Sequence, residues 1–388
     1  MEHLLNQAVQ KIEISGIRKF FNLVSNTEDM ISLTIGQPDF PTPDYVKTAG
    51  ISAIENNYTS YTHNAGFIEL REAASQYIKK HYHLDYKLDE IIVTSGASQA
   101  LDVTLRTILA PNTEVILPSP VYPGYEPLIK LCGAKPVFVD TTMNQFKLTA
   151  SLIKQAITAN TRCIILPYPS NPTGVSLSKH ELQEIADLIK GKEIFVIADE
   201  IYSALTYENE HVSIASYLKD QTIVINGLSK SHSMTGWRIG FTFAPRNITK
   251  HMLKVHQYNV SCASSISQKA AIAALSGGET ESREMLNIYK ERRDFVFQRL
   301  QEMELETVKP DGAFYFFVKI PSFITENSFD FALNLAKKAK VAVVPGSAFS
   351  GGEDGYFRIS FACSLENLEE GLHRIDSYLT KVRLEEIG

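Results

Sequence analysis

Cysteine is scarce in this chain, and long hydrophobic runs are absent. The cysteines lie far apart, with no CxxC pair and no histidine at ligand spacing: Cys132, Cys163, Cys262 and Cys363. This argues against a zinc site and against a disulfide framework, so we expect no bound metal. No apolar run approaches the roughly 18 residues of a membrane-spanning helix, and the segment MEHLLNQAVQKIEIS lacks the continuous apolar stretch of a secretory signal. We therefore expect a soluble, cytoplasmic protein with reduced thiols.

Positive charge is also in short supply. The chain has 38 Lys and Arg against 44 Asp and Glu, a formal net charge of −6, and its basic residues form no run. Nucleic-acid-binding proteins normally show a basic face, and anionic membranes attract clustered basic residues. Neither partner is expected. With 388 residues, 44% of them hydrophobic, the chain has enough material for two domains around ample cores.

Short β-rich runs recur through the middle of the chain, with helical patterns between them. Most are continuously apolar, as strands covered by helices on both faces are. The runs cover residues 90–95, 114–118, 136–140, 162–167, 193–199, 222–227 and 238–243. Between two of them, SKHELQEIADLIKG predicts a helix that Ser178 caps and Gly191 ends. This alternation predicts an α/β fold with a doubly wound, mainly parallel sheet.

The pattern changes toward the C-terminus. A long charged helix leads into GAFYFFVKI, VAVVPG and YFRISFAC and then into a last amphipathic helix, which indicates a smaller α+β unit. We predict an N-terminal arm over residues 1–45 that joins the small domain. A large domain is expected over residues 46–282 and a small C-terminal domain over residues 283–388.

Polar and special residues follow five of the predicted strands at the same end. The segments are TSGASQ, SPVYPGY, PYPSNPTG, DEIY and GLSK. Because ligands in such sheets collect beyond the carboxyl ends of the strands, we expect one site built from these loops. The turn at Gly96, Ala97 and Ser98 opens a helix and so offers backbone N–H groups to an anion such as phosphate. Arg238 could supply the countercharge, and Tyr122 offers a flat face for stacking.

Lys230 is the central candidate of this site. It is either a solvated loop lysine or an amine that forms an imine with a carbonyl cofactor. A nucleotide P-loop is excluded, because that motif has glycine directly before the lysine, where this chain has Ser229.

Four further residues are candidates for the same site, and two of them, Asp199 and Arg358, have two interpretations each. Asp199 either caps the next turn or holds a ring nitrogen protonated, and a helical turn would bring Tyr202 to the same side. Asn171 precedes a proline and could simply build a turn. Arg358 lies in an apolar strand-like run, where it forms either a structural ion pair or a bidentate contact with a substrate carboxylate.

The segment GLSKSHSMTGWRIG resembles the pyridoxal-phosphate attachment signature of the class I aminotransferases. IGQPDF, SYTHNAG, TSGASQAL, SPVYPGYE, PSNPTG, ADEIY, GAFYFF and FRISF resemble further segments of that family, in the same order and over essentially the whole chain. The resemblance implies a fold type I enzyme, a pyridoxal 5′-phosphate cofactor, 2-oxoglutarate as amino acceptor and a homodimer with shared sites.

Within the family, PYPSNPTG and INGLSKSHSMTGWRIGF are especially similar to enzymes of the diaminopimelate–lysine pathway. This similarity implies N-acetyl-LL-2,6-diaminopimelate as the amino donor. Aspartate, aromatic or branched donors remain alternatives, as does a β-lyase on the same scaffold. A non-catalytic regulatory module is a further alternative of a different class, but the chain has no basic region for a DNA-binding segment.

The resemblance also implies roles in binding the cofactor ring. Lys230 matches the lysine that binds the cofactor covalently and later acts as general base. Asp199 is implied to pair with the ring nitrogen, and Asn171 and Tyr202 to hydrogen-bond the ring hydroxyl oxygen. Tyr122 is implied to stack on the ring.

Other residues are implied to bind phosphate or substrate. Phosphate contacts are implied for Gly96, Ala97, Ser98, Ser229 and Arg238. Gly227 stands where several relatives have a phosphate-binding serine. Without that side chain, more of the phosphate binding would fall to Ser229 and Arg238. Tyr61 is implied to reach the phosphate of the neighbouring subunit. Substrate contacts are implied for Gly36, Asn171 and Arg358, and Arg106 lies near the position where some relatives bind a distal carboxylate.

Overall fold

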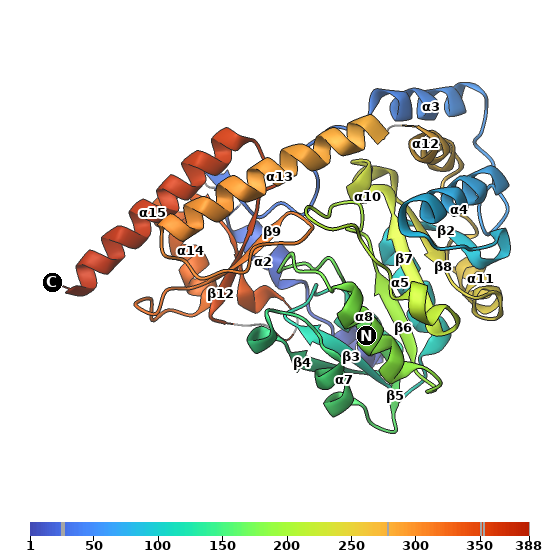
Figure 1. The fold of residues 1–388 in the computed structure, drawn as a ribbon, viewed down its shortest axis with the longest axis horizontal. Coiled ribbons are helices and arrows are strands. Elements are labelled where there is room, and N and C mark those ends of the chain that lie inside the picture. The colour runs from blue at the N-terminus through green and yellow to red at the C-terminus, as the bar shows by residue number, and fades with distance from the viewer. Residues whose placement is uncertain (25–27, 278, 350, 352–353, 388) are drawn as a thin grey trace.

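A seven-stranded sheet forms the centre of the larger part of the molecule (Figure 1). The computed structural model describes residues 1–24, 28–277, 279–349, 351 and 354–387. The strand order is β2-β8-β7-β6-β5-β3-β4, and only β8 runs antiparallel to its neighbours. The strands are β2 (Ile91–Ser95), β3 (Glu114–Ser119), β4 (Lys135–Asp140), β5 (Thr161–Leu166), β6 (Phe195–Asp199), β7 (Thr222–Gly227) and β8 (Ile239–Phe243). The predicted mainly parallel α/β sheet is confirmed.

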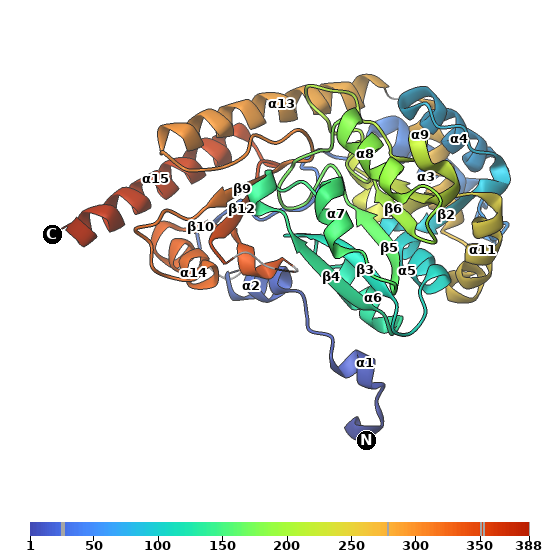
Figure 2. The same ribbon diagram turned by 60° about the horizontal axis from the view of Figure 1, so that its bottom comes forward.

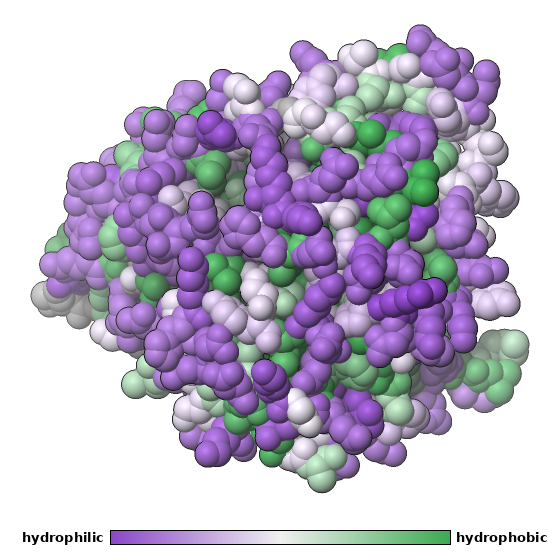
Figure 3. All heavy atoms as spheres, turned by 45° about the vertical axis from the view of Figure 1, so that its right-hand side comes forward, coloured by the Kyte–Doolittle hydropathy of each residue, from purple (hydrophilic) through white to green (hydrophobic). Residues whose placement is uncertain are grey.

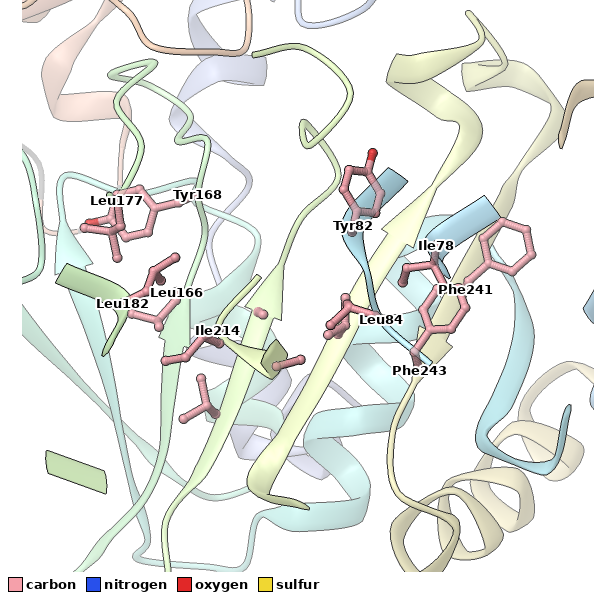
Figure 4. Packing of buried hydrophobic residues seen from close by; sticks show 14 of the residues in the cluster. Ile78, Tyr82, Leu84, Leu166, Tyr168, Leu177, Leu182, Ile214, Phe241 and Phe243 are labelled. Carbon is pink, nitrogen blue, oxygen red and sulfur yellow. The ribbon is translucent and has the colours of Figure 1, made fainter. Parts of the chain in front are cut away.

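Helices cover both faces of this sheet, which explains why its strands are continuously apolar. In β2, Ile92 packs into a cluster with helix α5, whereas its neighbour Val93 packs into a cluster on the opposite face. Figure 4 shows part of this second cluster, where Ile78 of α4 lies against Phe241 and Phe243 of β8. Alternating side chains of one strand thus enter different cores, and each must be apolar.

The helices of this larger part lie between and around the strands. They are α3 (Asp44–Glu55), α4 (Ile68–Tyr82), α5 (Gly96–Ile108), α6 (Tyr125–Leu131), α7 (Ala150–Ala156), α8 (Lys179–Ile189), α9 (Ala215–Leu218), α10 (Leu228–Ser231), α11 (Arg246–Val260) and α12 (Ser265–Ser276). Short 3-10 turns are η2 (Leu88–Glu90), η3 (Thr142–Asn144), η4 (Lys219–Gln221) and η5 (Thr235–Trp237). The predicted cap of α8 is confirmed, because Ser178 and Glu181 form a capping box.

A second, smaller group of elements packs around its own core. The strands β9 (Tyr315–Lys319), β11 (Val344–Pro345) and β12 (Tyr356–Ser360) form an antiparallel sheet in the order β11-β12-β9. The helices are α13 (Glu279–Glu302), α14 (Ser328–Ala339) and α15 (Leu365–Ile387), with a 3-10 turn η6 (Gly346–Ala348). In Figure 1, α13 extends from beside α12 to α15 and so links the two groups.

The N-terminal residues contribute to this smaller group. Strand β1 (Ile31–Ser32) pairs in parallel with β10 (Val341–Ala342), and α2 (Gly16–Val24) buries Phe20 and Val24 in the same core. Helix α1 (Gln7–Gln10) lies near α6, and η1 (Glu2–Leu4) precedes it at the N-terminal end in Figure 2. The domain division at residues 45 and 282 stays a prediction, and α13 crosses the second of these positions without a break.

The predicted absences concern membranes, metals and disulfides. Among the described residues, no helix is both long and apolar enough to cross a membrane. Within the same residues, no group of histidine, cysteine or acidic side chains is arranged to hold a metal ion. All four cysteines are free thiols. The cytoplasmic location stays a prediction.

Candidate active site

The loops after five strands meet at the carboxyl edge of the central sheet. Residues after β3 and β6 are joined directly, because Tyr125 Oη donates a hydrogen bond to Asp199 Oδ2 at 2.7 Å. The start of α5, after β2, lies against Arg238 at the start of β8. Helix α10, after β7, carries Lys230 into the same region, as the ring contacts below describe. The expected convergence of loops is therefore present.

The Lys230 amine is half-buried and hydrogen-bonded rather than free in solvent. Its Nζ donates a hydrogen bond to the Gly36 carbonyl and lies 5.6 Å and 5.7 Å from the ring centroids of Tyr202 and Phe314. Burial, together with the nearby positive charges of Arg358 and Arg238, lowers the pKa of Lys230 to about 8. A lysine with such a pKa is partly neutral near pH 7, which makes it a usable nucleophile and base. The structure thus favours the reactive-amine interpretation over a fully solvated loop lysine, and the role of Lys230 stays a prediction.

Asp199 is a buried carboxylate at the end of β6. Besides the hydrogen bond from Tyr125, its Oδ1 accepts one from the Ile201 backbone N–H at 3.3 Å, so it does cap the next turn. None of the described residues forms an ion pair with it. Burial raises the pKa of Asp199 to about 6, against the lowering effect of its hydrogen bonds. Such a carboxylate is well suited to a cationic ligand group.

The start of α5 forms a cradle beside a guanidinium. Gly96 has φ +75°, and a Cβ there would lie 2.4 Å from Arg238 Nη2, so only glycine fits. Ala97 and Ser98 follow in the first turn, where backbone N–H groups have no partner within the helix. Arg238 is anchored by its Nη1, which donates to the Thr235 carbonyl at 2.9 Å. Anions bind at such a combination of helix N-terminus and arginine.

Arg358 is buried on β12, and no carboxylate of the described residues pairs with it. Its Nη1 donates to Asn171 Oδ1 at 2.8 Å and its Nη2 to the Thr34 carbonyl at 2.7 Å. Its guanidinium lies 4.2 Å from the ring centroid of Tyr315, and its Nε has no partner among the described residues. The structural ion pair that the sequence left open is absent from the described part of the chain. A buried guanidinium of this kind suits an anionic ligand.

The remaining predicted residues differ in their distance from this cluster. Tyr122 is exposed, and its ring centroid lies 5.6 Å from that of Tyr125. Ser229 is buried beside Lys230 in α10. Tyr61 is 87% exposed between α3 and α4 and is not brought to the cluster. Its predicted contact with a neighbouring subunit stays a prediction.

Arg106 lies away from the cluster. Its Nε donates to both carboxylate oxygens of Asp102, at 2.8 and 2.9 Å, one turn earlier on α5. It stands ten residues after Gly96, about 15 Å along the helix axis. The structure therefore places Arg106 in a local ion pair and not among the residues around Lys230.

Sequence reasoning did not single out three residues that hold this site together. Tyr125 orients Asp199, Tyr315 Oη lies 2.8 Å from Tyr202 Oη, and Thr34 binds Arg358 through its carbonyl. Tyr125 carried a usable signal, because it stands at helical spacing from Tyr122 in SPVYPGY. The other two contacts have no local signature.

Comparison with known proteins decides the family. The family model for class I and II aminotransferases matches residues 28–375. The chain belongs to this family. It is 62% identical over 384 residues to the probable N-acetyl-LL-diaminopimelate aminotransferase of Bacillus subtilis, covering 99% of this chain and 98% of that one. The predicted aminotransferase activity is thereby confirmed.

Two further aminotransferases show the same likeness over the whole chain. The aromatic-amino-acid aminotransferase 2 of Thermococcus litoralis is 40% identical over 387 residues, 98% of this chain and 99% of that one. The crystal structure of an aspartate aminotransferase from Rhizobium meliloti superposes with a TM-score of 0.91 at 35% identity, covering 96% and 98% of the two chains. The predicted fold is therefore that of the aminotransferase family.

Proposed function

We propose that this aminotransferase binds pyridoxal 5′-phosphate covalently through Lys230 and exchanges an amino group between an amino acid and 2-oxoglutarate. The observation that carries the proposal is the half-buried Lys230 amine at the carboxyl edge of the sheet, with a pKa of about 8. More of this amine is neutral at pH 7 than of an exposed lysine, and only the neutral form attacks an aldehyde.

The surrounding residues fit a phosphorylated pyridine ring. Asp199 is buried without a cationic partner among the described residues, and its raised pKa would fall again beside a protonated ring nitrogen. Arg238 and the N–H groups at the start of α5 would bind the phosphate, in a cradle that a Cβ at Gly96 would fill. Tyr122 would stack on the ring.

The chain's own residues then orient groups and move protons. When bound, the cofactor supplies an electron-poor ring that stabilises negative charge on the neighbouring carbon. Asp199, oriented by Tyr125, would keep the ring nitrogen of the cofactor protonated. Lys230 Nζ would accept and return a proton near neutral pH, as its lowered pKa of about 8 allows. Asn171 and Tyr202 would hydrogen-bond the ring hydroxyl oxygen.

Arg358 would bind the α-carboxylate of the substrate, with the Gly36 backbone beside it. The guanidinium is already held by Asn171 and Thr34, so little entropy is lost when a carboxylate binds. A buried arginine that gains its first anionic partner also recovers part of the cost of its burial.

We further propose N-acetyl-LL-2,6-diaminopimelate as the amino donor, in lysine biosynthesis. The support is the name of the Bacillus subtilis relative, at 62% identity over nearly the whole length of both chains. Aspartate and aromatic donors are the second candidates, because the relative from Thermococcus litoralis is named for aromatic amino acids and one from Pyrococcus abyssi for aspartate, each at 40% identity.

A homodimer is proposed as well, and one exposed surface supports it. Residues 58–64 lie against the segment after α11, where Asn64 Nδ2 donates to the Ser261 carbonyl at 2.8 Å. Exposed hydrophobic residues gather on α3, this loop and the end of α11: Ile51, Ile54, Tyr58, Tyr61, Tyr258 and Val260. On this side of the molecule, Figure 3 shows hydrophobic residues at the surface between the hydrophilic ones. Exposed hydrophobic side chains on neighbouring segments are a feature of subunit interfaces, which supports the proposed dimer contact here.

Cofactor binding at Lys230 can be tested by absorbance spectroscopy with added pyridoxal 5′-phosphate. Borohydride reduction followed by peptide mass spectrometry then locates the adduct. We expect one adduct, on Lys230, and a Lys230→Ala variant that folds but neither forms it nor transfers amino groups. A purified protein that binds no cofactor, or that carries the adduct on another lysine, would contradict the proposal.

A screen of amino donors against 2-oxoglutarate tests the substrate. The panel contains N-acetyl- and N-succinyl-diaminopimelate, aspartate, phenylalanine and leucine, and we expect the highest kcat/KM with the N-acetyl compound. Preference for phenylalanine would select the aromatic alternative. Release of pyruvate and ammonia from a sulfur amino acid, without an oxo acid, would select a β-lyase instead.

A further inference from the structure

Residues 34–42 cross the site and contact both of its central cations. The Thr34 carbonyl accepts a hydrogen bond from Arg358 Nη2 at 2.7 Å, and the Gly36 carbonyl accepts one from Lys230 Nζ. Both contacts come from the backbone of this segment, which we call the strap. The positions of the two side chains therefore depend on where the strap lies.

The strap is fastened to α13 through Asp39. Its Oδ1 accepts hydrogen bonds from Tyr289 Oη at 3.0 Å and from Arg292 Nη1 at 2.9 Å, and its backbone N–H donates to Tyr289 Oη at 3.3 Å. The Arg292 side chain is only 12% exposed, and its guanidinium lies 5.4 Å and 5.6 Å from the ring centroids of Phe40 and Tyr289. A charge-assisted pair so little exposed is screened less by solvent than a surface pair.

The other end of the strap is fastened to the loop that follows Lys230. Thr42 Oγ1 donates to the Ser233 carbonyl at 2.7 Å and accepts from Trp237 Nε1 at 3.0 Å. Pro38 stands between Gly36 and Asp39, and its ring restricts the backbone there. If the backbone moves at Asp39, we therefore expect the Gly36 carbonyl to move with it, because Pro38 limits backbone rotation between them.

We propose that Asp39, held by Arg292 and Tyr289, is a positioning residue for the transfer reaction. Through the strap it determines where Gly36 and Thr34 hold the Lys230 amine and the Arg358 guanidinium. The proposal rests on the proposed roles of those two cations, and it assigns Asp39 no contact with substrate or cofactor. Loss of Asp39 should move the Lys230 amine and the Arg358 guanidinium and so slow the reaction. A misplacement of about 1 Å at reacting groups costs on the order of 100-fold in rate.

The test compares Asp39→Asn, Arg292→Gln and their double variant with a matched control on the same helix. Arg299→Gln serves as the control, because it removes ion pairs of α13 to Glu302 and Asp376 that do not involve the strap. In the cofactor-loaded enzyme we expect Asp39→Asn to lower kcat/KM for the amino donor by about 10- to 100-fold. The double variant should be no worse than the worse single one, as for two residues of one interaction.

Two further measurements separate positioning from simple destabilisation. Cofactor affinity of Asp39→Asn should fall by a smaller factor than kcat/KM, since Asp199 and the start of α5 make no contact with Asp39. Because loss of a little-exposed ion pair also lowers stability, kcat/KM is compared at saturating cofactor and at a temperature well below the unfolding midpoint of every variant. Hydrogen–deuterium exchange of peptides covering residues 34–42 should be faster in Asp39→Asn and Arg292→Gln than in the control.

The proposal is overturned if kcat/KM of Asp39→Asn stays within about twofold of the control, or falls only in proportion to lost cofactor binding or to the unfolded fraction. Unchanged exchange over the strap would also overturn it. Absence of amino transfer in the unsubstituted protein would refute the proposed function instead, and strap exchange would then still decide whether Asp39 holds the strap.

Discussion

Replacing Asp199 with asparagine should stabilise the cofactor-free protein although it removes a residue of the proposed active site. The carboxyl group is fully enclosed, and burial raises its pKa from the ordinary 3.8 to about 6. The native state therefore binds this proton more tightly than the unfolded state. Above about pH 6 the group is ionised in both states, and its burial then costs about 3 kcal/mol of the free energy of unfolding. Below pH 3.8 this cost disappears.

Asparagine avoids the buried charge and keeps an acceptor for Tyr125 Oη. We therefore expect Asp199→Asn to raise the free energy of unfolding at pH 8 by up to about 3 kcal/mol, and to lose this gain as the pH falls from 6 to 4. Urea unfolding of the cofactor-free protein, followed by the fluorescence of the single tryptophan, Trp237, measures the effect. The loaded variant should lose amino transfer by about 100-fold or more, because the ring nitrogen loses its ionic partner.

The matched control is Asp187→Asn, which changes an exposed aspartate on α8 and should alter stability by less than about 0.5 kcal/mol at any pH. Tyr125→Phe should act in the opposite direction to Asp199→Asn at pH 8, since it removes a hydrogen bond that favours the ionised carboxylate. A stability gain for Asp199→Asn that is no larger at pH 8 than at pH 4 would refute the reasoning.

Three other changes probe the remaining parts of the site. Arg358→Ala should lower kcat/KM for amino donors by about 10- to 100-fold, which corresponds to the loss of a charge-assisted contact of about 1.5–3 kcal/mol. Cofactor affinity should change little, and equal losses in kcat/KM and cofactor affinity would contradict the carboxylate-binding role of Arg358. Gly96→Ala should weaken cofactor binding at least tenfold, because the φ of +75° and the contact with Arg238 exclude a Cβ at this position. The control Gly355→Ala, where a Cβ meets nothing within 4 Å, should bind the cofactor normally. In the cofactor-free protein, acylation of Lys230 should follow a pH midpoint near 8, and a midpoint above 10, as for an exposed lysine, would argue against a half-buried amine.

The central sheet could be predicted closely from local patterns. Each of the seven strands begins and ends within two residues of a predicted run, because burial on both faces requires consecutive apolar side chains. The same holds for the capped start of α8 at Ser178 and for the glycine that opens α5. Polar segments placed after successive strands predicted the site, since parallel strands bring their carboxyl ends to one edge.

The partners of the charged side chains could not be predicted in this way. Tyr125 and Asp199 meet across 74 positions of the chain, and Arg358 and Thr34 across 324. Arg106, a candidate for a distal carboxylate by position, is instead paired with Asp102 on its own helix.

The sequence alone thus determined the fold class and the family, because periodicity, glycine positions and short motifs reflect backbone conformation and burial. It also led to the proposal that Lys230 is the lysine that binds the cofactor. Only the tertiary structure decided that, within the described part of the chain, Asp199 has no cationic partner and Arg358 no carboxylate, and that Asp39 ties the strap to α13. These are contacts between polar groups from distant segments. They depend on how whole layers pack, and they leave no periodic trace along the chain.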